Sequence, residues 1–114
     1  MPVVAYLWTC AIEIPLVLLA LRQVGWVRHA GIRRTIGVAW LVQFTQPALW
    51  FLGPRDLTWL VAAEVMVWLA EGVAIWALLR PRVPGARLLD ALAAAVLANA
   101  ASFAFGLAFP SLIG

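Results

Sequence analysis

The chain has 114 residues, of which 66% are hydrophobic and 11% charged, and its formal net charge is +3. A water-soluble domain carries about a quarter charged residues, so this composition excludes an ordinary soluble fold. The single cysteine and single histidine also exclude an internal disulfide and a cysteine–histidine metal cluster. The sequence therefore predicts an all-α integral membrane protein made of one domain.

Four apolar stretches follow one another along the chain, covering residues 3–21, 36–52, 57–79 and 88–109. A membrane-spanning helix needs roughly 20 mostly apolar residues, so each stretch is a candidate span. The first stretch has no basic leader and is interrupted by Glu13, which argues against a cleavable signal peptide. We expect four transmembrane helices in a compact bundle, joined by short connections.

The basic residues are all arginines, and they lie where the apolar stretches end. Only Arg55 lies in the second connection, whereas seven lie in the first and third: Arg22, Arg28, Arg33, Arg34, Arg80, Arg82 and Arg87. The positive-inside rule then predicts that both termini are external and that the arginine-rich loops are cytoplasmic, as in a bacterial inner membrane. Topology and attraction to anionic lipids explain this charge, so no nucleic-acid partner is expected. Trp26 is expected at headgroup depth in the first connection.

The two halves of the chain resemble each other weakly. Residues 13–22 read EIPLVLLALR and residues 71–80 read EGVAIWALLR, so a glutamate precedes an arginine by nine positions in both. The next span of each half then carries a polar pair, Gln43 with Gln46 and Asn99 with Ser102. This pattern predicts two tandem helical hairpins related by a pseudo-twofold axis along the membrane normal.

Three glutamates, Glu13, Glu64 and Glu71, lie inside the predicted spans, and no basic residue accompanies them there. A charge at the bilayer centre costs about 2.5–3.5 kcal/mol, so such residues are usually functional. At a rise of about 1.5 Å per residue, Glu13 and Glu71 lie about 13–14 Å from their terminal arginines, near the membrane midplane. Glu64 lies two turns further out on the same helical face as Glu71.

Neutral polar residues on the returning spans fall at similar depths. Gln43 and Asn99 are expected near the midplane, and Gln46 and Ser102 one turn further out. Thr45 lies in the segment from Gln43 to Pro47, which resembles a kink that builds a site. Pro47 and Pro15 each leave a backbone carbonyl without its helical partner, and such carbonyls line cavities in membrane proteins.

These residues favour a small membrane protein that binds or passes a cation, most simply H⁺. Glu13 and Glu71 would be the primary ligands, Glu64 an outer relay, and Gln43 and Asn99 neutral ligands, because burial disfavours a bare carboxylate. One alternative is an accessory or scaffold subunit of a larger membrane complex. A third is a membrane enzyme or lipid-headgroup-binding protein. No catalytic residue or cofactor is evident, any metal is left open, and a homo-oligomer or a subunit of a complex is expected.

Overall fold

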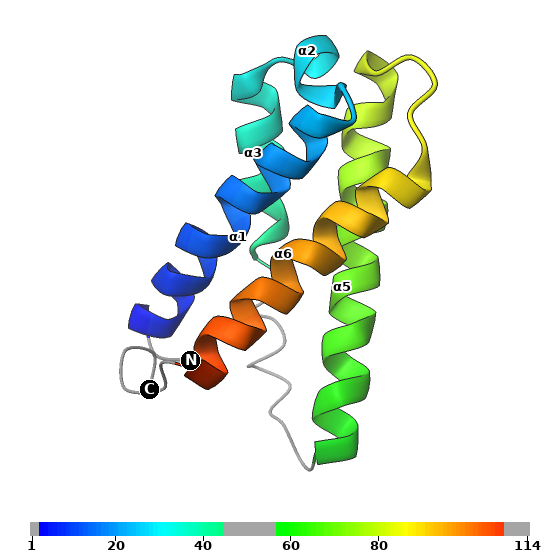
Figure 1. Ribbon diagram of the computed structural model, residues 1–114. Helices are drawn as coiled ribbons and strands as arrows, with labels where there is room; N and C mark the ends of the chain where they lie inside the picture. Colours follow the sequence, from blue (N-terminus) through cyan, green and yellow to red (C-terminus); the bar gives the residue numbers. More distant parts are fainter. Residues whose placement is uncertain (1–2, 45–56, 109–114) are drawn as a thin grey trace.

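The computed structural model describes residues 3–44 and 57–108, and every regular element in these two ranges is helical (Figure 1). The α-helices are α1 (Val3–Gln23), α2 (Trp26–Ala30), α3 (Ile32–Val42), α5 (Leu57–Leu79) and α6 (Leu88–Ala108), and α5 runs into the 3-10 helix η1 (Arg80–Arg82). An apolar chain satisfies its backbone polar groups in lipid by forming helices, which accounts for this content.

Three of the helices, α1, α5 and α6, are long and apolar enough to cross a membrane. Their bounds agree closely with the predicted spans: α5 coincides with residues 57–79, α1 extends two residues beyond 21, and α6 ends one residue before 109. Pro15 lies inside α1, as predicted. The second predicted span, 36–52, is only partly described: α3 covers its beginning, and residues 45–56 lie outside the described ranges. The fourth transmembrane helix therefore stays a prediction.

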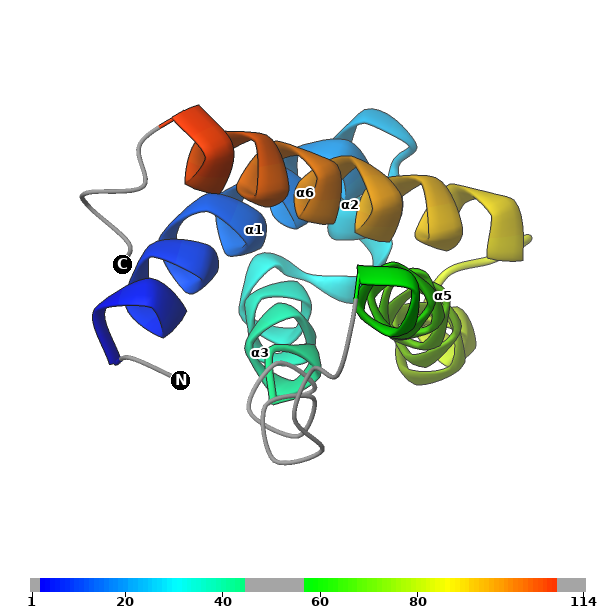
Figure 2. The same ribbon diagram turned by 90° about the horizontal axis from the view of Figure 1, so that it is seen from below.

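Four helices, α1, α3, α5 and α6, are arranged as a ring. Helix α1 packs against α6 and α3, and α5 also packs against α6 and α3, so α1 and α5 are separated by the other two (Figure 2). The beginnings of α1 and α5 and the end of α6 lie at one end of the bundle, and α2 and η1 lie at the other (Figure 1). Helices α1 and α5 therefore run in the same direction, and α6 runs opposite to both.

All seven arginines of the described ranges lie at the end that carries α2 and η1, which we call the arginine end. Trp26 lies here as well, and its indole is turned into the bundle, so its predicted headgroup depth stays a prediction. Only 2% of its surface is exposed, and it packs in the hydrophobic core with Leu21, Leu79 and Val83. The short helix α2 turns the indole inward, under the connection, instead of toward the lipid headgroups.

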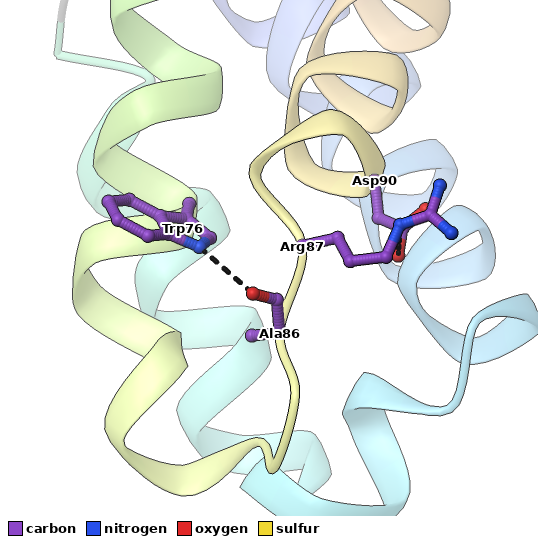
Figure 3. A network of polar contacts seen from close by, with 4 residues as sticks. All are labelled: Trp76, Ala86, Arg87 and Asp90. Carbon is purple, nitrogen blue, oxygen red and sulfur yellow. Dashed lines mark hydrogen bonds and ion pairs between the residues drawn. The ribbon is translucent and has the colours of Figure 1, made fainter.

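The turn between α5 and α6 is held by polar contacts of Trp76. Its indole nitrogen donates a hydrogen bond to the carbonyl oxygen of Ala86 at 3.2 Å (Figure 3). The guanidinium of Arg80 lies 4.5 Å from the centre of the indole ring, a cation–π contact. Arg87 pairs with Asp90 across 3.8 Å at the start of α6 (Figure 3). These contacts fix where α6 begins relative to α5.

Helix α6 approaches its neighbours closely because its inner face is made of small residues. Ala91, Ala94, Ala95 and Ala98 are buried, each at most 1% exposed. On α5, a Cβ atom added to Gly72 would lie 2.8 Å from the Cα atom of Leu92, so only glycine permits this helix contact. These small residues let α6 pack closely within the bundle, as small residues do between membrane helices.

The distribution of apolar and polar side chains between surface and interior is the reverse of that in a water-soluble protein. Large apolar side chains point outward: Phe44, Met66 and Leu107 are 66%, 67% and 69% exposed. Buried polar side chains lie inside the ring. Water would disfavour so much exposed apolar surface, whereas lipid accepts it. The arrangement is that expected of a membrane protein.

Candidate functional site

Four polar side chains meet inside the ring, one from or next to each of its four helices. Glu13 comes from α1, Glu71 from α5 and Asn99 from α6, and Gln43 is the C-cap that directly follows α3. Each is at most 2% exposed. We call these four residues the polar centre. All four were predicted to lie near mid-membrane from their distance to the terminal arginines.

One half of the polar centre is fixed by hydrogen bonds. The amide nitrogen of Asn99 donates to a carboxylate oxygen of Glu71 at 2.6 Å and to the backbone carbonyl oxygen of Ala95, one turn earlier in α6, at 2.7 Å. The bond to Ala95 orients the amide, because it ties the side chain to its own helix. The bond to Glu71 joins α5 to α6 across the interior.

The other half of the polar centre is less constrained. The side chains of Gln43 and Ser102 approach the carboxyl group of Glu13. Neither the amide nitrogen nor the amide oxygen of Gln43 has a hydrogen-bond partner, and one carboxyl oxygen of Glu13 also lacks one. Buried polar atoms are nearly always paired, so three unpaired atoms at one place mark a point where a water molecule, an ion or another polar group can bind.

The two halves interact electrostatically, because Glu13 and Glu71 are close enough to repel each other when both are ionised. The arginines of the described ranges are about 13–14 Å or more away along α1 and α5. Within those ranges the only ion pair is that of Arg87 and Asp90, outside the polar centre. Two bare carboxylates in a buried setting are costly, so protons or a cation must offset at least part of this charge.

Glu64 is not part of the polar centre. It is half-buried on α5, and one of its carboxyl oxygens accepts a hydrogen bond from the indole nitrogen of Trp68 at 3.1 Å. It contributes only weakly to the electrostatic environment of Glu13. Ser102, predicted as a secondary polar residue, approaches the carboxyl group of Glu13. Gln46 and Thr45, also predicted as polar contributors, lie outside the described residues.

Two features of this region were not anticipated from the sequence. The backbone carbonyl of Ala95 acts as an anchor for Asn99, and an asparagine inside a helix is the signal that suggests such a bond to the preceding turn. Thr35 is completely buried, but its hydroxyl donates to the carbonyl of Gly31 at 2.8 Å, so it is satisfied locally. Cys10 is buried one turn before Glu13, as a small core residue.

Comparisons with protein families, curated proteins and solved structures give no match, so the polar centre is interpreted from its own geometry. In the two described ranges, no group of three or more histidine, cysteine, aspartate or glutamate residues is arranged to hold a metal ion. Two carboxylates with two amides form an oxygen-rich donor set, which suits a proton or a hard cation better than a soft transition metal.

Proposed function

We propose that the protein binds or passes a cation, most simply H⁺, at the polar centre. The observation that carries this proposal is the pair Glu13 and Glu71: both are 2% exposed, and they repel each other when ionised. No arginine of the described ranges lies beside them to balance their charge. Binding a proton or a cation is the simplest way to make such a pair compatible with a buried site.

The amides give the two carboxyl groups different roles. Glu71 is held by Asn99, whose nitrogen is already committed to two acceptors, so Glu71 keeps one orientation. Gln43 is uncommitted. Its nitrogen donates to Glu13 when Glu13 is ionised, and its oxygen accepts from Glu13 when Glu13 is protonated, after the amide rotates. We therefore propose that Glu13 gains and loses the proton or cation. Glu71 keeps a fixed orientation and contributes the neighbouring negative charge.

The order of the helices around the ring supports the predicted repeat and the predicted fourth span. In the ring, α1 is separated from α5 and each carboxylate helix is followed by a segment that carries an amide. A pseudo-twofold axis along the membrane normal would exchange Glu13 with Glu71 and Gln43 with Asn99. We propose that residues 36–52 form the fourth span and complete this relation.

Glu64 is the proposed outer relay. It is two helical turns from Glu71 on the same face of α5, about 10 Å away along the helix axis, on the side away from the arginine end. Its bond from Trp68 holds the carboxyl group near that face. A cation leaving the polar centre toward that side would meet Glu64 next.

The test is flux into liposomes that contain only this protein, followed with a dye that reports internal pH. Glu13→Gln and Glu71→Gln retain size and hydrogen bonding but remove the titrating charge, and each is expected to abolish the flux. Asp90→Asn is the matched control: it also removes a carboxylate, but from the start of α6, outside the polar centre. It is expected to leave the flux unchanged.

The competing function, a scaffold subunit, predicts a different result. The wild type alone would then show no ion-dependent flux or binding, and the Glu→Gln variants would instead lose a partner protein. That outcome overturns the proposal. Equal loss of flux in Asp90→Asn would also overturn it, because the effect would then not belong to the polar centre.

A further inference from the structure

A hollow at the arginine end carries a second concentration of charge, independent of the polar centre. It has a volume of about 580 Å³ and opens to the surface. It forms where α1 ends and the chain turns into α2. The residues that line it are Arg22, Gln23, Val24, Gly25, Val27 and Arg28.

The backbone of this turn brings the two arginines to one hollow. Gly25 has a φ of +86°, a left-handed conformation that glycine adopts without strain, and its N–H donates to the carbonyl of Arg22 at 3.1 Å. A Cβ atom added to Gly25 would lie 3.8 Å from Nη2 of Arg28, so the Arg28 guanidinium lies over the turn. Arg22 reaches the same hollow from the last turn of α1.

No carboxylate of the described ranges balances these two charges. The one ion pair there joins Arg87 to Asp90, at the start of α6. Arg22 and Arg28 are both exposed, whereas Trp26 beneath the turn is 2% exposed and packs in the core. The hollow therefore has two exposed guanidinium groups, without an ion pair in the described ranges, and an apolar lining from Val24 and Val27.

We propose that this hollow binds a phosphate group, with the guanidinium groups of Arg22 and Arg28 as its donors. Guanidinium groups match phosphate oxygens geometrically and form charge-assisted hydrogen bonds with them. The side chain of Gln23 adds an amide donor, and the two valines suit the carbon atoms next to the phosphate. Such a phosphate belongs either to the headgroup of a phospholipid or to a free phosphate ion, because the hollow lies at the end of a candidate span.

The experiment measures binding to the full-length protein in a neutral detergent at physiological salt. One arm titrates a short-chain phosphatidic acid, and the other titrates inorganic phosphate. The double variant Arg22→Gln/Arg28→Gln is compared with Arg33→Gln/Arg34→Gln, which removes the same charge from the exposed start of α3. Each lost charge-assisted bond lowers affinity by about tenfold or more, so the first variant should bind about 100-fold more weakly. The control should change by about threefold or less, because salt screens distant exposed charges.

If Arg22→Gln/Arg28→Gln weakens the binding of phosphatidic acid but not of inorganic phosphate, the hollow is assigned to a lipid headgroup. Loss in both arms with similar affinities assigns it to phosphate in general. The proposal is overturned if neither probe binds the wild type, or if the control variant loses as much affinity as the test variant. The latter result would mean that diffuse positive charge, not the hollow, attracts the anion. Near-ultraviolet circular dichroism, to which the seven tryptophans contribute, verifies that both variants remain folded.

Discussion

Asn99 and Glu71 are joined by a hydrogen bond of 2.6 Å between residues that are 28 positions apart, and this bond crosses from α6 to α5. The corresponding amide on the other side of the bundle, Gln43, has no such bond. The two amides were predicted to be equivalent, yet one is tied to a carboxylate and the other is free to respond to a ligand. Their substitutions should therefore have opposite effects on stability.

Asn99→Ala should lower the free energy of unfolding, because it removes a donor from the buried carboxyl group of Glu71. Combined with Glu71→Ala, which removes the acceptor, in a double-mutant cycle, it should give a coupling free energy of about 0.6 kcal/mol and at most about 1.7 kcal/mol, the range seen for hydrogen bonds between membrane helices. Denaturant unfolding in detergent measures this value. A coupling free energy of zero would contradict the assigned contact.

Gln43→Leu should leave the free energy of unfolding unchanged or raise it by up to about 1–3 kcal/mol, because it removes two buried polar atoms that have no partner. The same variant should lose cation binding or flux, since Glu13 then has no adaptable amide beside it. Unfolding and liposome flux are measured on the same preparation. Strong destabilisation by leucine would show that Gln43 holds helices together instead of serving a ligand.

Gly72→Ala should destabilise the bundle by about 1–3 kcal/mol, the usual cost of overpacking. The new methyl group would meet Leu92 at 2.6 Å and 2.8 Å, and the second of these atoms is backbone, so α5 and α6 must separate. Gly37→Ala on α3 is the control, because its new methyl group meets no atom within 4 Å. The control should leave the free energy of unfolding unchanged, or raise it by about 0.5–1 kcal/mol because alanine has the better helix propensity.

Topology can be tested with a membrane-impermeant maleimide. In a Cys10→Ala background, Arg33→Cys and Arg82→Cys at the arginine end should react only after the membrane is permeabilised. Thr58→Cys, at the exposed beginning of α5, should react in intact cells. The reverse pattern would place the arginine end outside, and labelling of all three sites in intact cells would indicate mixed insertion.

The long helices were predictable because their limits coincide with strong local signals. Helix α5 runs without interruption from Leu57 to the Arg80–Pro81 stop, and α6 follows Pro84 and Gly85. That Glu13, Gln43, Glu71 and Asn99 come to a similar level of the bundle was predictable as well, since a fixed rise per residue converts sequence distance into position along a helix.

The neighbours of each polar residue were not predictable, because helix order around the ring is not encoded in any one segment. Nothing local indicates that Asn99 bonds to Glu71 while Ser102 approaches Glu13. The burial of Trp26 was missed for a similar reason. An aromatic residue near an arginine cluster is typical of an interfacial anchor, but the turn at Gly25 redirects it into the core.

The placement of seven arginines at a single end also constrains how copies of the protein can assemble. The positive-inside rule predicts that each copy inserts with that end on the same side of the membrane, and the following consequence holds if it does. A twofold axis lying in the membrane plane would put the arginine ends of two copies on opposite sides, so antiparallel pairs are disfavoured. Copies would associate in parallel, around an axis perpendicular to the bilayer, as cyclic assemblies do. Every polar centre in such an assembly would then face the transmembrane potential with the same polarity.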